Sequence, residues 1–388
     1  MNEIRLFTSE SVCEGHPDKI SDLIADSILD DALSGDPKSR VACEVCCSTG
    51  VVFVMGEFDT KKFIDIPSII RNVIKEIGYN KPEYGFDYHT VGVISYINQQ
   101  SEDIAQGVNC GDKTDDERDN TGAGDQGMMF GYASNETSEY MPLPLSLAHA
   151  LTKNLSIARK SGKIPYLRPD GKAQVTVLYE NDVPKYVDTV VVSAQHDEDI
   201  ANEQIRNDII KYVVEKAIDK KYLTNDTKYF INPTGRFVKG GPHADSGLTG
   251  RKIIVDTYGG VCPHGGGSFS GKDPTKVDRS AAYYSRYVCK NIVAAGLCDK
   301  IELQVAYAIG KAKPVSISIN TFGTEKINKQ KILQAIEQVF DFRPFSIIKQ
   351  LDLFRPIYAQ TTNYGHMGKE GLPWEELNAV KTLKEFLK

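Results

Sequence analysis

A helix, a hairpin and a second helix recur three times along the chain, and this repeated pattern limits the possible folds more than any other feature. Apolar residues recur at helical spacing over 17–32, 142–159 and 274–295. Each of these segments opens with a proline, which suits the first turn of a helix because no backbone N–H is needed there. The copies share this pattern rather than sequence identity, so it predicts three similar folding units.

Strand-like runs and a further helical pattern follow each first helix. They predict hairpins over 41–57, 173–194 and 301–322 and second helices over 66–77, 205–217 and 332–340. We therefore expect an α+β fold of three pseudo-symmetric domains, each a small β-sheet backed by helices on one face. The alternative interpretation is that these common elements recur by chance. The expected domains span 3–101, 121–239 and 240–380, with a lid loop and linker over 100–120.

Composition and charge exclude several classes of protein. The 388 residues are 41% apolar and 25% charged, as in ordinary globular proteins. A net charge of −6 argues against a general nucleic-acid binder. No run approaches the roughly 20 apolar residues of a membrane span, and the N-terminus lacks the features of a signal peptide. We therefore expect a cytoplasmic protein without membrane or nucleic-acid partners, and a homo-oligomer, since the uncovered sheet faces need burial.

The eight cysteines do not suggest a disulfide framework. Cys43 and Cys46 form a CxxC inside a predicted strand, where residues three apart face opposite ways and do not easily share a metal. Reduced, structural thiols are the expectation.

A glycine- and lysine-rich segment at the start of the third predicted helix carries the strongest chemical signal. It reads GGGSFSGKDPTKVDRSAA over 265–282. Its first part has the spacing of a phosphate-binding P-loop, but Asp273 stands where Ser or Thr would hold magnesium. We expect Asp273 to be the N-cap of this helix, so that Lys272, Lys276 and Arg279 face one anion and Asp278 faces a metal.

Two other junctions have similar chemistry. In GHPDKIS over 15–21, Asp18 could hold magnesium and His16 could touch a phosphate; the alternative is that Asp18 only complements the helix dipole. In GAGDQG over 122–127, glycines around Asp125 suggest a tight turn near a ligand, or a plain loop. A Rossmann fingerprint is excluded because no strand precedes these glycines.

Further cations and carboxylates complete the pattern. Singly, each is explained by a surface salt bridge, but together they resemble a pocket for a metal polyphosphate. The cations are Lys172, Arg236, Arg251 and Lys252, and the carboxylates are Asp18, Asp125, Asp245 and Asp278.

These motifs, together with NPTGRFVKGGP over 232–242 and DSGLTGRKIIVDTYGG over 245–260, resemble those of the S-adenosylmethionine synthetase (methionine adenosyltransferase) family. The resemblance runs along nearly the whole chain. It implies ATP and L-methionine as substrates, attack of the methionine sulfur on C5′ of ATP, and hydrolysis of the expelled tripolyphosphate to pyrophosphate and phosphate. It also implies Mg²⁺, two per site, K⁺, three similar α+β units, and a homodimer or homotetramer with active sites between two subunits.

The resemblance also implies roles for individual residues. For the nucleotide, His16, Arg251, Lys252 and Lys272 would contact the phosphates, and Asp170, Lys172, Arg236, Phe237 and Ser268 would lie at ATP. Ser268 stands where the family pattern has alanine, and its backbone would serve equally well. For methionine, Glu57 would bind the ammonium group with Gln100 nearby, at the start of a gating loop. Asp125, Asp245 and Lys276 would serve methionine or both substrates, Asp18 and Asp278 would bind magnesium, and Glu44 would bind potassium.

Two other functions stay open on the residues alone. A P-loop-like kinase is disfavoured by Asp273 and by the lack of a matching Walker B strand. A threefold ring or scaffold, of the kind that encircles DNA, is disfavoured by the acidic balance and by cations that gather in glycine-rich loops.

Overall fold

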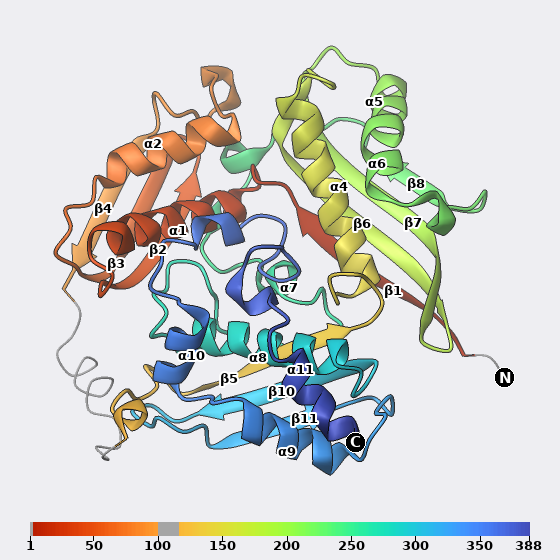
Figure 1. Ribbon diagram of the computed structural model, residues 1–388. Helices are drawn as coiled ribbons and strands as arrows, with labels where there is room; N and C mark the ends of the chain where they lie inside the picture. Colours follow the sequence, from red (N-terminus) through yellow and green to blue (C-terminus); the bar gives the residue numbers. More distant parts are fainter. Residues whose placement is uncertain (1–2, 100–115) are drawn as a thin grey trace.

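Three small sheets, each covered on one face by helices, make up the computed structural model, which describes residues 3–99 and 116–388 (Figure 1). The predicted α+β class with three similar units is confirmed. Gln100 and most of the predicted lid over 100–120 lie outside the described residues. Among the described helices, none is long and apolar enough to cross a membrane.

The first sheet has the order β4-β3-β2-β9 and lies beneath α1 (Pro17–Gly35) and α2 (Ile66–Ile77). Its strands are β2 (Arg40–Ser48), β3 (Val51–Asp59), β4 (Gly92–Asn98) and β9 (Gly247–Leu248). Alternate residues of β2, from Val41 to Cys47, are buried against the helices. The other face of this sheet carries no helix of its own chain (Figure 1) among the described elements.

The second sheet has the order β1-β6-β7-β8 and packs against α4 (Leu143–Lys160). Its strands are β1 (Ile4–Val12), β6 (Leu167–Glu180), β7 (Val183–His196) and β8 (Lys228–Ile231). The predicted second helix over 205–217 is interrupted: α5 (Asn202–Ile209) passes through a π-helical stretch into α6 (Glu215–Ala217).

The third sheet has the order β11-β10-β5 and packs against α8 (Val277–Ala294). Its strands are β5 (Gly127–Ser134), β10 (Lys300–Tyr307) and β11 (Ser316–Asn320). The remaining helices are α7 (Ile253–Asp256), α9 (Lys329–Val339), α10 (Pro344–Leu351) and α11 (Val380–Leu383).

The three units exchange strands in a ring. The strand before each first helix pairs, antiparallel, with the hairpin of the next unit: β1 with β6, β5 with β10, and β9 with β2. Each of the ranges 3–101, 121–239 and 240–380 therefore contains its own hairpin and helices but contributes its first strand to another sheet. A contiguous division of the chain does not describe the sheets, because an antiparallel edge strand can come from any part of the sequence.

The expectation that Asp273 caps the third helix is wrong. The helix begins at Val277, and its N-cap residue, Lys276, makes no side-chain cap. Asp273 instead closes a turn, because its Oδ1 accepts hydrogen bonds from the N–H (3.0 Å) and hydroxyl (2.6 Å) of Thr275. Its Oδ2 accepts the N–H of Val41 at 2.8 Å, which ties the turn to the first sheet.

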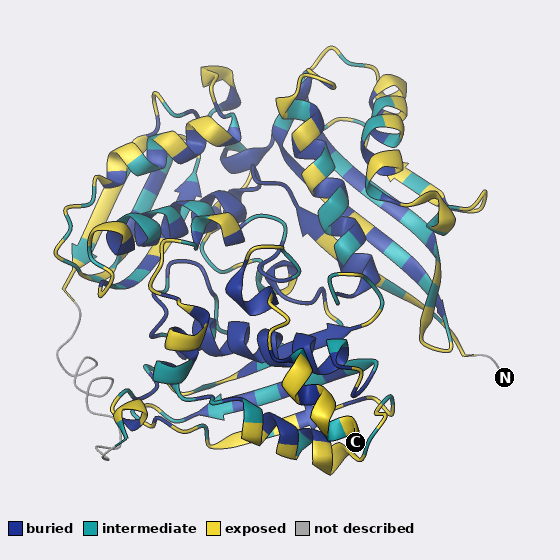
Figure 2. Cartoon of the chain, viewed as in Figure 1, coloured by how far each residue is buried: buried dark blue, intermediate teal, exposed yellow. Residues whose placement is uncertain are grey.

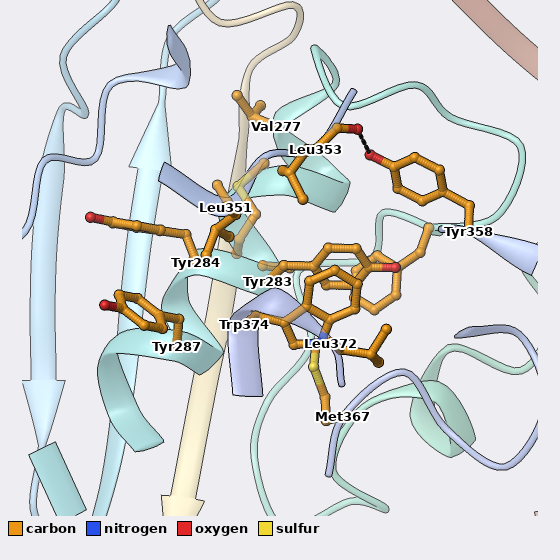
Figure 3. Packing of buried hydrophobic residues seen from close by; sticks show 14 of the residues in the cluster. Val277, Tyr283, Tyr284, Tyr287, Leu351, Leu353, Tyr358, Met367, Leu372 and Trp374 are labelled. Carbon is orange, nitrogen blue, oxygen red and sulfur yellow. Dashed lines mark hydrogen bonds between the residues drawn. The ribbon is translucent and has the colours of Figure 1, made fainter. Parts of the chain in front are cut away.

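The first and third sheets and their helices share one core, which also takes in Met141 and Leu145, and the second sheet with α4 has a core of its own. Helix α8 is buried along almost its whole length (Figure 2). Trp374 stacks on Tyr283 of α8 with ring centroids 3.7 Å apart (Figure 3). Its indole N–H donates to the carbonyl of His366 at 2.9 Å. Seven cysteines are free thiols, as expected, and Cys110 lies outside the described residues.

Candidate active site

A first group of site residues gathers at the N-terminus of α1. His16 is the N-cap, and its Nδ1 accepts the N–H of Asp18 at 3.2 Å. Asp18 Oδ1 accepts the N–H of Leu248 at 3.0 Å, and its Oδ2 accepts Lys252 Nζ at 2.5 Å. Arg251 Nε lies 3.8 Å from Asp18 Oδ1. Strand β9 thus brings the cations of residues 251 and 252 to the start of α1.

The charges around His16 favour its neutral form. The pKa of His16 is lowered to about 3, chiefly by burial and to a smaller extent by the ammonium groups of Lys252 and Lys172. Burial raises the pKa of Asp18, but hydrogen bonds from Lys252 and from the N–H of Leu248 outweigh it and the net shift is downward. The group therefore presents a neutral imidazole, a carboxylate and several cations.

Asp170 and Lys172 reach the same place from β6. Asp170 is buried, and its Oδ2 accepts the N–H of Gly241 at 2.8 Å. Burial raises the pKa of Asp170 to about 6, with a smaller contribution from the nearby Asp245 carboxylate. Its Oδ1 is buried and has no hydrogen-bond partner among the described residues, so it is available to a ligand donor. We call His16, Asp18, Asp170, Lys172, Asp245, Arg251 and Lys252 the first cluster.

Arg236 and Phe237 lie beside this cluster rather than in it. Arg236 is 63% exposed and pairs with Glu198 at the surface. The ring of Phe237 flanks Gly240, where a Cβ would lie 2.8 Å from it. Asp170 binds the N–H of Gly241, the residue after Gly240, so Phe237 borders the first cluster. Arg236, in contrast, points to solvent.

A second group lies where the glycine-rich segment meets the first sheet. Lys272 Nζ is 2.7 Å from Asp278 Oδ2. Burial raises the pKa of Glu44, and the Lys272 ammonium acts against this shift. Lys276 forms an ion pair with Asp273. We call Glu44, Glu57, Lys272, Lys276 and Asp278 the second cluster.

The two glutamates of the second cluster share the uncovered face of the first sheet. Glu44 is paired with Met55, and Glu57 with Ala42, so all four side chains point away from α1 and α2. Glu44 and Glu57 both reach the surface, and only part of the Glu44 carboxylate is shielded from solvent, which is enough to raise its pKa. Within residues 3–99 and 116–388, neither carboxylate forms a hydrogen bond or an ion pair in the structure, which is typical of side chains that meet a ligand or a partner.

Asp125 and Ser268 lie at the edges of the two clusters. Asp125 is exposed, and its Oδ1 accepts the N–H of Gln126 at 2.7 Å. Its loop comes close to the second cluster, because a Cβ on Gly127 would lie 3.6 Å from Asp278 Oδ1. Ser268 packs against Gly250, beside the loop of the first cluster.

The two aspartates expected to bind magnesium lie in different clusters. Asp18 is paired with Lys252 and Asp278 with Lys272, and no group of three or more His, Cys, Asp or Glu within 3–99 and 116–388 could hold a metal ion. Single carboxylates nevertheless fit Mg²⁺, which proteins often hold by one or two carboxylates plus substrate phosphates. The arrangement therefore suits magnesium that arrives with a polyphosphate.

Two buried aspartates that the sequence reasoning missed lie beside the clusters, one at each cluster. Asp22 Oδ1 accepts the N–H of Gly250 at 2.8 Å, and Asp26 Oδ1 accepts the N–H of Gly271 at 2.8 Å. The available signal was their spacing, since they follow Asp18 at intervals of four on a predicted helix.

Comparison with known proteins identifies the family of this chain. The family models for the N-terminal, central and C-terminal domains of S-adenosylmethionine synthetase match residues 4–102, 120–237 and 239–376. An S-adenosylmethionine synthase of Thermus thermophilus is 57% identical over 390 residues, covering 99% of both chains. One of Clostridium tetani is 58% identical over 389 residues, covering 99% of this chain and all of the relative. The chain therefore belongs to the S-adenosylmethionine synthetase family of methionine adenosyltransferases.

Proposed function

We propose that this enzyme makes S-adenosylmethionine by direct attack of the methionine sulfur on C5′ of ATP. A sulfur lone pair forms the S–C5′ bond while the C5′–O bond breaks, and the bond electrons leave with the intact triphosphate. The thioether carries no proton, so this step needs no general base. Hydrolysis of the tripolyphosphate to pyrophosphate and phosphate then consumes one water.

The observation that carries this proposal is the concentration of cations around the neutral His16. Lys172, Arg251 and Lys252 surround the N-terminus of α1, where the helix dipole already favours anions. Fixed positive groups in a partly buried site stabilise negative charge that develops on a leaving oxygen. A neutral His16 can donate one hydrogen bond to that oxygen without losing a proton.

Magnesium, held by Asp18 and Asp278, would neutralise part of the triphosphate charge. The lysines that pair with these carboxylates would then turn toward the phosphates. We assign potassium to Glu44, the methionine ammonium to Glu57, and the nucleoside to the surroundings of Asp170 and Phe237.

We further propose that each active site combines the first cluster of one chain with the second cluster of a second copy. Exposed apolar side chains surround Glu44 and Glu57 on the uncovered face of the first sheet, where exposed fractions are 39% for Met55, 53% for Ile94, 66% for Tyr96 and 40% for Leu248. A patch of this kind marks a protein interface. This supports a homodimer, or a homotetramer made of two such dimers.

Product analysis tests the reaction. With ATP, methionine and Mg²⁺, we expect a sulfonium nucleoside, pyrophosphate and phosphate in equal amounts. ADP together with a phosphorylated acceptor would refute the proposal and favour a kinase. Lys272→Met should slow sulfonium formation by orders of magnitude while the melting temperature stays near that of the wild type.

Mixed dimers test the shared site. Lys252→Met disables the first cluster and Lys272→Met the second, so a dimer of one chain of each kind keeps one intact site. Heterodimers purified through two different affinity tags should recover about half of the wild-type rate, from two nearly inactive parents. Recovery of no activity would refute the sharing of clusters between chains, but not the reaction.

A further inference from the structure

Helix α1 carries four aspartates at intervals of four residues, and each accepts backbone N–H groups from a part of the chain that is distant in sequence. Asp18 accepts the N–H of Leu248 (3.0 Å), Asp22 that of Gly250 (2.8 Å), Asp26 that of Gly271 (2.8 Å), and Asp30 those of Tyr358 (2.9 Å) and Ala359 (2.8 Å). We call this row the aspartate ladder.

The ladder is unfavourable for helix stability alone. Like charges four residues apart repel, and buried carboxylates are costly unless they are paired and hydrogen-bonded. Asp22 and Asp26 are fully buried. Each has a buried cation, since Lys19 Nζ lies 3.0 Å from Asp22 and the Arg279 guanidinium binds both oxygens of Asp26 at 2.6 and 2.7 Å. Because these buried ion pairs are costly for the helix, they indicate that the positions of the loops held by the carboxylates matter.

Asp22 fixes the loop of the first cluster. The residue it binds, Gly250, immediately precedes Arg251 and Lys252. Gly250 has φ 76°, and a Cβ there would lie 2.4 Å from Ser268, so the backbone sits close to its neighbours. Lys19 also binds Asp256 at 2.6 Å, and thus both ends of the segment 250–256 are tied to α1.

Asp26 fixes the loop of the second cluster. It holds the N–H of Gly271, and its partner Arg279 donates to the carbonyl of Lys272 at 3.2 Å. The carbonyl of Gly271 in turn accepts the N–H of Cys43 at 2.9 Å. The backbone on both sides of the Lys272 side chain is therefore anchored.

We propose that Asp22 and Asp26 are positioning residues, with Asp22 placing Arg251 and Lys252 and Asp26 placing Lys272 against the triphosphate. The inference rests on the proposed function. Because the two clusters would serve different active sites of a dimer, one helix sets the geometry of half of each site. Asp30, the last residue of the ladder, holds the 358–359 loop, which carries no residue of either cluster, and it provides the control.

The first test is kinetic. Displacement of a catalytic group by about 1 Å costs on the order of 10²-fold in rate, so Asp22→Asn and Asp26→Asn should each lower kcat about 10²-fold. Asp30→Asn should keep kcat within about twofold. A kcat near that of the wild type in either of the first two variants would overturn the proposal.

The second test sorts the variants by cluster, which a general loss of stability would not do. In heterodimers, Asp22→Asn should recover about half of the wild-type rate with Lys272→Met but none with Lys252→Met. Asp26→Asn should show the opposite preference. The reference is the heterodimer of Lys252→Met with Lys272→Met. If that reference recovers activity but an aspartate variant recovers activity with both partners, or with neither, the positioning roles are overturned. If the reference itself recovers no activity, the proposed shared site is wrong instead.

If an asparagine variant does not fold, Asp22→Glu and Asp26→Glu take its place, since they keep the charge but displace the acceptor oxygen by about one bond length. The same sorting is expected of them. If neither replacement folds, the carboxylate is structural and the positioning role is refuted.

Discussion

Replacement of Gly247 by alanine should separate the loop of the first cluster from α1. A Cβ at this position would lie 2.1 Å from the carbonyl oxygen of Pro17 and 2.8 Å from the N–H nitrogen of Asp18. Backbone atoms cannot give way as a side chain can, so β9 must retreat by about 1 Å to restore ordinary contact. That shift stretches the 3.0 Å hydrogen bond from Leu248 to Asp18 beyond bonding distance.

A misplacement of this size should lower kcat/KM for ATP about 10²-fold, which corresponds to about 2.7 kcal/mol of transition-state stabilisation. Initial rates of sulfonium formation at varied ATP measure it, and thermal unfolding shows whether the variant is folded. Gly92→Ala is the control, because the nearest atom to its Cβ, the carbonyl oxygen of Gly50, would be 3.5 Å away. A folded Gly247→Ala enzyme within threefold of the wild type would refute the reasoning.

Three further predictions concern metal, core and pH. Asp278→Asn should raise the half-saturating Mg²⁺ concentration roughly tenfold or more in a magnesium titration, because an anionic ligand is lost; an unchanged titration would remove Asp278 from the metal site. Trp374→Ala should lower the free energy of unfolding by about 3–5 kcal/mol in denaturant titrations, because a fully buried indole is deleted. Burial raises the pKa of Asp30 from 3.8 to about 6, so its contribution to stability is present below pH 4 and is lost as the pH rises through 6. The Asp30→Asn variant should therefore gain stability relative to the wild type as the pH rises from 4 to 6. Melting temperatures of the two proteins that change in parallel over that pH range would contradict this.

Periodicity in the sequence was sufficient to predict the helices and hairpins but not the exchange of strands. A hairpin is local, and its two strands are joined by a turn that sets their register. Strand β1 has no such connection: its partner β6 begins more than 150 residues later in the chain, and either edge of three similar hairpins would accept its alternating pattern. Strand β9, with two residues, is too short to show any pattern.

The same limit applies to the site. Glycines and cations in loops are visible as motifs, so His16, Lys252 and Lys272 were predicted with the loops that carry them. Asp273 was misassigned because an aspartate before a proline satisfies the local preferences of both an N-cap and a turn, and only the distant N–H of Val41 decides between them. Asp22 and Asp26 were missed because their partners lie more than 220 residues away, at Gly250 and Gly271.

The ring of exchanged strands closes at its weakest point, and that point is the first cluster. Strands β1 and β5 pair with their hairpins over nine and eight residues, whereas β9 pairs with β2 over two. Hydrogen bonds between Thr249 and Val45 extend this short pairing, and the carboxylates of Asp18 and Asp22 add further hydrogen bonds to the backbone of Leu248 and Gly250. Because β9 is so short, the chain leaves the sheet directly after it. Arg251 and Lys252, which come next, can therefore turn toward the start of α1. At the candidate active site, aspartate side chains of α1 therefore anchor the exchanged segment, whereas long backbone pairing anchors the exchanged strands β1 and β5.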